Sequence, residues 1–171
     1  MSEEDWDTLY SCPICHTDEC VPPIGPQNSK ILIIGAFPGK DEIKEGKPMV
    51  GVNGGILREE LRKCGVDMKR LRITNLWQHA PNDNAGCLVH WAKQAIHEAK
   101  GKQAILLIGS ETVKYFCQCS VEAYNGLLVQ SDYLKAPMVM ACIQPVNVFK
   151  VGLGEVRLTI QKFSSHLEGL L

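Results

Sequence analysis

The sequence predicts an α/β protein, a three-layer α/β/α sandwich with a central, mainly parallel four-stranded sheet. Apolar runs of strand length alternate with longer segments that have the apolar spacing of a helix, a pattern typical of a parallel sheet between helical layers. Glycine-rich loops follow the first run, as in open sheets whose ligands bind beyond the carboxyl ends of the strands. The expected strands are residues 31–34, 71–76, 104–108 and 138–143.

Length and composition set the broad class of the protein. The 171 residues are expected to form a single domain, residues 1–171, with residues 1–29 as a cysteine-bearing N-terminal segment. A hydrophobic fraction of 45% and a charged fraction of 22% are ordinary for a globular protein. No apolar run reaches transmembrane length and the acidic N-terminus has no signal-peptide pattern, so we expect a soluble, intracellular protein without a membrane partner. The net charge of −1 means that nucleic-acid binding would depend on a local basic face.

The first strand is too short for a helix of its own and is rich in β-branched residues. An extended linker at residues 22–29 precedes it, and glycine-rich loops at residues 35–39 and 51–55 follow it, separated by a charged connection at residues 40–47. The first loop is not a nucleotide P-loop, because three residues rather than four separate its outer glycines. The glycine spacing of a dinucleotide site is absent as well.

The helices are predicted from apolar spacing and from capping residues. Residues 54–64 carry an apolar stripe and end before Gly65, a plausible C-cap. Ser110 is expected to cap a helix that runs to about Cys117. The remaining expected helices are residues 87–99 and 154–167, and Asn125-Gly126 marks a turn.

Eight cysteines without a secretory signal favour a metal ion or cluster over disulfides. Cys12 and Cys15 form a C-x-x-C pair, which presents two thiolates to one metal from a tight turn. A complete site needs two more ligands, which are Cys or His for zinc and mostly Cys for an iron–sulfur cluster. Three other cysteines are expected to pack in or near the core: Cys64, Cys117 and Cys119.

Several motifs occur in a fixed order between Cys12 and Lys162. The first strand runs into Gly-x-x-Pro-Gly at residues 35–39, Lys-Pro-Met-Val-Gly follows at residues 47–51, and Thr74-Asn75 ends the second strand. This arrangement resembles the uracil-DNA glycosylase superfamily, above all its iron–sulfur branch. That branch has G-E-A-P-G, R/K-P-F-V-G and T-N motifs and a His-Pro dipeptide near the C-terminus. The resemblance implies the same α/β/α fold and DNA as a partner.

The resemblance also implies a set of metal ligands. In the iron–sulfur enzymes a 4Fe–4S cluster is bound by an N-terminal C-x-x-C pair and by two later cysteines, which here implies Cys12, Cys15 and Cys87. The position after the T-N motif holds His79, so the fourth ligand is either His79 or Cys20. We expect Cys20, because thiolates are the usual cluster ligands. Zinc is the alternative to the cluster.

In the related enzymes four groups act on a base flipped out of DNA, and three of them are replaced here. Asn75 matches the side chain that reads the polar edge of uracil. Ala36 stands at the position of the catalytic carboxylate, Met49 at that of a stacking Phe, and Gln144 at that of the His that donates to the departing base. The expected base pocket comprises Gly35, Phe37, Pro38, Gly39, Met49, Asn53 and Asn75.

Loss of one aligned electrostatic donor costs about 10²–10³ in rate, so we expect weak or absent uracil excision. The expected function is that of a uracil-DNA-glycosylase-like iron–sulfur protein that binds DNA, a DNA polymerase or another replication or repair protein. One alternative is an active DNA glycosylase for uracil or another deaminated base, in which Phe37 stacks and Asp41 or Glu42 supplies the acid. Another is a zinc-bearing protein-interaction module. The basic residues expected to face a duplex are Lys40, Lys47, Lys150 and Arg157.

Overall fold

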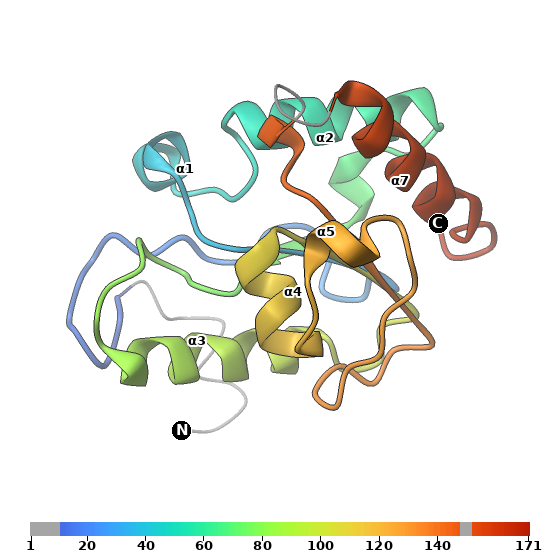
Figure 1. Ribbon diagram of the computed structural model, residues 1–171. Coiled ribbons are helices and arrows are strands. Elements are labelled where there is room, and N and C mark those ends of the chain that lie inside the picture. The colour runs from blue at the N-terminus through green and yellow to red at the C-terminus, as the bar shows by residue number, and fades with distance from the viewer. Residues whose placement is uncertain (1–10, 148–151) are drawn as a thin grey trace.

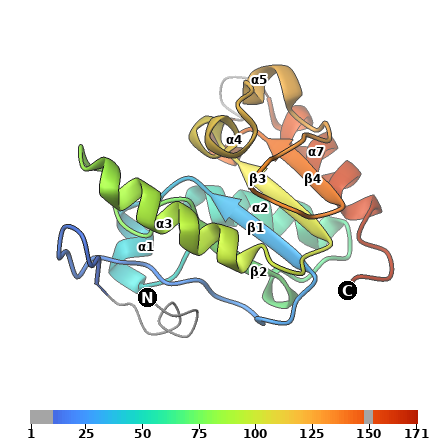
Figure 2. The same ribbon diagram turned by 90° about the horizontal axis from the view of Figure 1, so that it is seen from below.

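The computed structural model describes residues 11–147 and 152–171. Its centre is one sheet of four parallel strands in the order β2-β1-β3-β4, which confirms the predicted fold class (Figures 1 and 2). Every residue of the four strands is buried, as expected for a parallel sheet covered on both faces. The strands are β1 (Ile31–Gly35), β2 (Arg72–Asn75), β3 (Ala104–Ile108) and β4 (Met138–Cys142).

Helices cover both faces of the sheet. Figure 1 shows α2 (Val52–Lys63) and α7 (Leu153–Ser165) above the sheet, with α3 (Ala85–Glu98) and α4 (Ser110–Cys117) below it. The two outer layers bury apolar stripes against the strands, so the core is continuous from one layer to the other. Shorter elements complete the described chain: α1 (Lys40–Glu45), α5 (Val121–Tyr124) and two 3₁₀ helices, Met68–Arg70 and Pro145–Asn147.

Three predictions about local structure differ from the structure. Gly65 was expected to be a helix C-cap, but Cys64 is the C-cap of α2 and Gly65 follows it. The connection expected at residues 40–47 contains the helix α1, whose residues are all outside the core, so that no apolar stripe announces it. Ser110 was expected to cap α4, but it is the first residue of that helix and Gly109 is the N-cap. Gly109 has a φ of 96°, a conformation that is unfavourable for residues with a side chain, and it forms the turn between β3 and α4.

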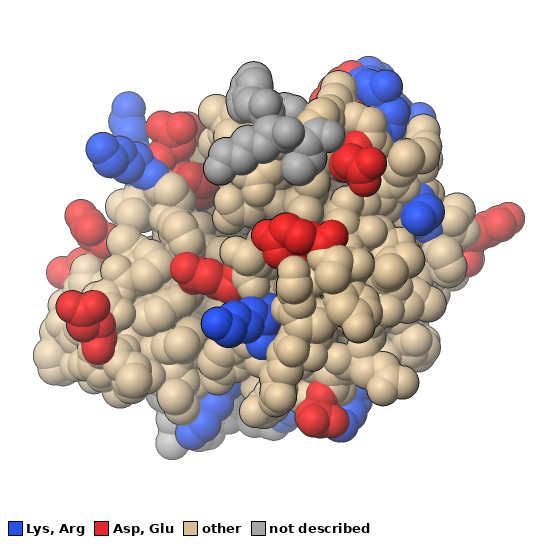
Figure 3. Space-filling view, viewed as in Figure 1, with Lys and Arg blue, Asp and Glu red and all other residues tan. Residues whose placement is uncertain are grey.

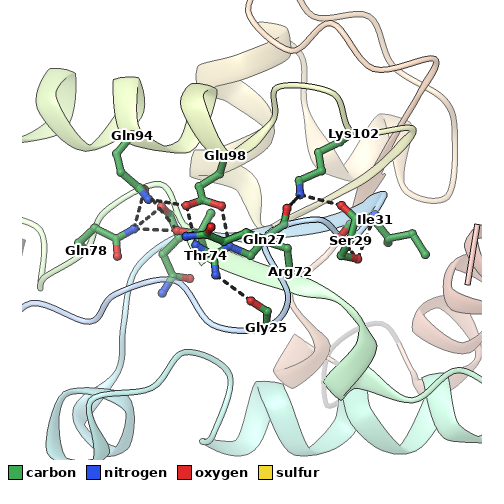
Figure 4. Close-up of polar contacts among 11 residues, drawn as sticks. Gly25, Gln27, Ser29, Ile31, Arg72, Thr74, Gln78, Gln94, Glu98 and Lys102 are labelled. Atoms are coloured by element: carbon green, nitrogen blue, oxygen red, sulfur yellow. Dashed lines mark hydrogen bonds and ion pairs between the residues drawn. The ribbon is translucent and has the colours of Figure 1, made fainter. Parts of the chain in front are cut away.

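The N-terminal segment runs beside β2 on its way to β1. Ile24 forms an antiparallel bridge with Ile73, and the backbone N–H of Val21 donates to the carbonyl of Gln78. Lys102 is buried and donates to the carbonyls of Gln27 (2.8 Å) and Ser29 (2.7 Å), which fixes the last part of the segment (Figure 4). The cysteines of the segment are therefore carried on a chain that is bonded to the sheet.

Among the residues that the structure describes, no helix is long and apolar enough to cross a membrane.

Candidate metal centre and adjoining cavity

Three cysteines and one histidine from distant parts of the chain meet at one place. The side chains come from the N-terminal segment, the loop after β2 and the first turn of α3, and their ligand atoms all lie within 4.8 Å of one another. Cys12 Sγ lies 3.8 Å from Cys87 Sγ, and Cys15 Sγ lies 3.7 Å from His79 Nε2. The chain therefore has a Cys/His metal-binding group made of Cys12, Cys15, His79 and Cys87.

The protein environment holds these ligands in place. Asn82 donates from Nδ2 to Cys87 Sγ over 3.6 Å, and His79 Nδ1 lies 2.7 Å from the carbonyl oxygen of Ala80. A backbone hydrogen bond from Thr17 lowers the pKa of the Cys15 thiol. Burial raises the pKa of Cys87 to about 11. A metal ion bound at this thiol would lower that pKa.

Cys20, the expected fourth ligand, does not lie in this group, in which His79, the alternative, is the fourth side chain; which of the two binds a metal stays a prediction. The Cys20 thiol faces the carbonyl of Thr17 at 3.6 Å, and burial raises its pKa to about 12. The spacing of the sequence did not distinguish Cys20 from His79, because the choice depends on how the loop after β2 turns.

A cavity of about 270 Å³ opens at the carboxyl ends of β1, β2 and β4, where an open parallel sheet places its ligand crevice. Eight of the residues predicted for the base site line it, whereas Pro38 does not. Asp41 and Glu42 line it as well, as the alternative interpretation requires. The eight residues are Gly35, Ala36, Phe37, Gly39, Met49, Asn53, Asn75 and Gln144.

Asn75 and Met49 both lie against Gly35, which has no side chain. A Cβ atom at Gly35 would collide with Asn75 Oδ1 and would lie 2.7 Å from the terminal methyl of Met49. Asn75 is buried at the end of β2, and its side-chain amide has no hydrogen-bond partner in the described part of the chain. The amide is thus free to bind a ligand that carries both a donor and an acceptor.

Two polar side chains tie together the loops around the cavity. Glu42 accepts hydrogen bonds from the backbone N–H of Gly39 (Oε2, 3.1 Å) and of Gly51 (Oε1, 2.9 Å), and so joins the two glycine loops. Asn53 Oδ1 accepts from the N–H of Val146 at 2.7 Å, which joins the second glycine loop to the loop after β4. These bonds occupy groups that could otherwise contact a ligand.

The metal centre and the cavity share one short segment, the loop after β2. The N–H groups of Leu76 and Trp77 donate to the carbonyls of Gly35 (2.8 Å) and Ala36 (2.9 Å), so the loop is bonded to the cavity wall. Asn75 stands at the start of this segment and His79 at its end.

Between these two residues, the buried Gln78 donates from Nε2 to Thr74 Oγ1 at 2.8 Å and to the carbonyl of Asn75 at 3.1 Å (Figure 4). Gln78 therefore fixes the backbone between the metal ligand and the cavity amide.

The basic residues expected to face DNA are not gathered in one patch. On the face shown in Figure 3, Lys and Arg are dispersed among Asp and Glu. Lys40 lines the cavity, and both Lys40 and Lys47 are exposed. Arg157 is paired with Glu60 at 3.1 Å, and Lys150 lies outside the described residues.

Comparison with known proteins agrees with this architecture. The family model of the Uracil DNA glycosylase superfamily matches residues 22–159, most of the chain. The Type-4 uracil-DNA glycosylase of Thermotoga maritima is 33% identical over 160 residues, which are 86% of this chain and 81% of that protein. The fold and the site thus define an α/β/α protein with a ligand cavity at the carboxyl ends of its strands. The chain belongs to the uracil DNA glycosylase superfamily, which confirms the resemblance seen in its motifs.

Archaeal relatives match over shorter stretches. The Type-4 uracil-DNA glycosylase of Archaeoglobus fulgidus is 36% identical over 80 residues, which are 44% of this chain and 40% of that protein. The Type-4 uracil-DNA glycosylase of Saccharolobus solfataricus is 38% identical over 83 residues, 46% of this chain and 38% of that protein. The matches span less than half the length of these archaeal relatives.

Sequence reasoning missed the two-loop role of Glu42 and the contact from Asn82 to Cys87. Glu42 follows Gly39 by three residues at the start of a helix, the spacing of a capping box, and this signal could have shown that its carboxylate turns back to the loop. No sequence signal indicates the contact of Asn82, because it depends on the path of residues 80–86.

Proposed function

We propose that this protein binds DNA with a uracil or related base turned into the cavity, and that it excises the base slowly or not at all. The observation that carries the proposal is the unpartnered amide of Asn75 on the wall of a cavity of about 270 Å³. A carboxamide can read a base edge that carries an adjacent donor and acceptor. Membership of the superfamily supports DNA as the partner. A protein partner such as a DNA polymerase stays a prediction.

Weak excision follows from the side chains around that amide. Removal of a base requires stabilisation of a cationic sugar and of an anionic leaving base. Ala36 has no charge for the first task, and Gln144 has only a neutral amide for the second. The Gln144 side chain lies next to Gly109 and lines the cavity, where its neutral amide can hold a base by hydrogen bonds but has no acidic proton to give to it.

Restoring the missing groups tests this proposal. Ala36→Glu and Gln144→His place a carboxylate and an imidazole at positions that line the cavity. We expect each change to raise the single-turnover rate of uracil excision by about 10²–10³, the size of one aligned electrostatic contribution. The matched controls are Ala36→Gln and Gln144→Leu, which fill similar space without the charge or the proton donor and should leave the rate unchanged.

The same variants define the results that contradict the proposal. If the unchanged protein excises uracil rapidly and Asn75→Ala abolishes this excision, the protein is a working glycosylase and the proposal is wrong. We expect Asn75→Ala to lower the affinity for uracil-containing single-stranded DNA at least tenfold. The affinity for the same DNA with thymine in place of uracil should change little. Equal affinity of the unchanged protein and Asn75→Ala for both DNAs would show that the cavity does not read a base.

One observation favours a second candidate, an active glycosylase with rearranged groups. The carboxylates of Asp41 and Glu42 both line the cavity. Glu42 uses both oxygens to accept backbone N–H groups, so Asp41, which is exposed, is the residue better able to place a water. Under this candidate the unchanged protein excises the base at a measurable rate, and Asp41→Asn abolishes that excision. Under the leading proposal Asp41→Asn changes nothing, because there is little excision to remove.

A further inference from the structure

The ligand atoms of the metal centre are as closely spaced as the ligands of a single ion. Cys12 Sγ and Cys87 Sγ are 3.8 Å apart, Cys15 Sγ and His79 Nε2 are 3.7 Å apart, and all four atoms lie within 4.8 Å of one another. A tetrahedral zinc ion with Zn–S bonds of about 2.3 Å and a Zn–N bond of about 2.0 Å separates its ligand atoms by about 3.5–3.8 Å. These two pairs therefore have the spacing that zinc requires.

A four-iron cluster does not fit this arrangement. In such a cluster each ligand binds a different iron atom, so the ligand atoms surround four irons and four sulfides and lie further apart than the ligands of one ion. The four atoms here, all within 4.8 Å of one another, enclose space for one ion. The ligand types also favour zinc over a cluster. Iron–sulfur clusters are bound mostly by thiolates, whereas three Cys with one His, the set found here, is common in structural zinc sites.

The histidine is fixed in the form that binds a metal. His79 Nδ1 lies 2.7 Å from the carbonyl oxygen of Ala80, and a carbonyl can only accept a hydrogen bond. Nδ1 therefore carries the proton, and the lone pair is on Nε2, the atom that faces Cys15 Sγ. Metal-bound histidines are held in this way, with the second ring nitrogen bonded to a carbonyl or carboxylate.

The C-x-x-C turn also presents two sulfurs to one point. The N–H of His16 donates to the carbonyl of Cys12 at 2.8 Å, and the N–H of Cys12 donates to the carbonyl of Thr17 at 2.9 Å. His16 adopts a left-handed φ of 61°, which closes the turn just after Cys15. The short C-x-x-C turn is typical of structural zinc sites.

We propose that Cys12, Cys15, His79 and Cys87 hold one tetrahedral zinc ion, in place of the iron–sulfur cluster that the motif resemblance implies. The ion would be structural, because four protein ligands close its coordination and leave no position for water or substrate. It would join the N-terminal segment, the loop after β2 and the start of α3. This inference concerns the metal centre alone and does not depend on whether the cavity binds a base.

Metal analysis of the full chain tests the identity of the ion. The protein is produced in medium that supplies both iron and zinc and is purified without oxygen, so that an oxygen-sensitive cluster would survive. We expect one zinc per chain, no acid-labile sulfide and a colourless protein. A brown protein with about four irons and four sulfides per chain would overturn the proposal.

Variants of the ligands test the assignment of His79. His79→Ala should lower zinc affinity by at least a hundredfold in competition with a chromophoric chelator. His79→Cys should keep one zinc with four thiolates, which shows that the fold tolerates a change at this position. Cys20→Ser is the matched control and should bind zinc like the unchanged protein. Loss of zinc in Cys20→Ser with retention in His79→Ala would overturn the ligand set.

Cobalt(II) substitution gives a readout that does not depend on affinity. A tetrahedral cobalt site with three thiolates and one imidazole absorbs strongly in the visible range, and its bands move when a ligand changes. We expect the spectra of the unchanged protein and Cys20→Ser to coincide and that of His79→Cys to shift. A spectrum that moves in Cys20→Ser and not in His79→Cys would contradict the assignment.

Discussion

At the scale of single residues, the cavity depends on atoms that are missing as much as on atoms that are present. Gly35 has no Cβ, and this lets Asn75 and Met49 approach the end of β1. Met49 itself adopts a left-handed φ of 59°, which is unusual for a residue with a side chain. Its carbonyl accepts a hydrogen bond from Arg58 Nη2 at 3.0 Å, which holds this conformation.

The carboxylate of Glu42 gives a prediction at this scale. Glu42→Gln leaves only one oxygen for the two N–H groups of Gly39 and Gly51 and removes the charge. A hydrogen bond to a charged group contributes about 1.5–3 kcal/mol, so we expect the two glycine loops to separate and affinity for uracil-containing DNA to fall about tenfold or more. Fluorescence anisotropy with a labelled oligonucleotide measures this change.

Asp41→Asn is the control for that measurement. Asp41 also lines the cavity but is exposed, so its change should alter affinity less than about twofold. Equal losses in the two variants would show that the negative charge near the cavity matters and that the bridging contacts of Glu42 do not.

At the scale of elements, a buried polar network fastens α3 and the N-terminal segment to the edge strand β2. Arg72 and Glu98 form a two-point ion pair with distances of 2.6 and 2.8 Å, and Arg72 also donates to the carbonyl of Gly25 at 2.8 Å (Figure 4). Gln94 donates to Glu98 at 3.3 Å and joins the pair to Gln78. The network thus runs from the linker to the loop that carries His79.

Breaking that ion pair should be far more costly than breaking one on the surface. Glu98→Ala leaves the buried Arg72 without its counter-charge, which lowers the free energy of unfolding by about 3–5 kcal/mol. Arg62→Ala removes an exposed pair with Glu59, whose side chains are 70% and 48% exposed, and should change the free energy of unfolding very little, because solvent screens this pair. Urea denaturation of both variants measures the difference. Similar costs for the two would show that the network does not stabilise the fold.

The elements also show what the sequence could predict. The strand β3 was predicted residue for residue, because its apolar run is continuous and a glycine ends it. The helix α1 was missed because none of its residues, Lys40–Glu45, is buried, so that no apolar stripe marks it, and the capping-box spacing of Gly39 and Glu42 was not used. Likewise the spacing of Cys12 and Cys15 indicated a metal site, whereas the choice of His79 depends on the direction of a loop.

At the scale of the whole molecule, the charge distribution limits how DNA can be held. The net charge is −1, and Arg157, one of the expected basic contacts, is already paired with Glu60. Under the proposed function, affinity for DNA would come mainly from the cavity, with few ionic contacts to phosphates, because Glu42 already accepts the backbone N–H groups of Gly39 and Gly51. A protein of this kind gains little from long-range attraction to a polyanion.

This charge distribution predicts a weak salt dependence. With Lys40 and Lys47 as the expected contacts that the structure describes as exposed, about two phosphates are neutralised, so the slope of log K against log salt should be about −2. Anisotropy titrations over a fourfold range of salt concentration give this slope. A slope steeper than about −4 would mean that a larger basic surface, away from the cavity, holds the DNA. Lys40→Ala should reduce the slope by about one unit.

The loop after β2 has one more consequence, which concerns insertions and deletions. Asn75 and His79 are four residues apart, and the backbone between them is bonded to the cavity wall through Leu76 and Trp77. An added or removed residue there would displace either the amide or the imidazole by the length of a peptide unit, about 3.8 Å. The next stretch, residues 80–86, is not held between the cavity amide and the histidine in this way. Among homologues, variation in length should therefore begin only after the histidine.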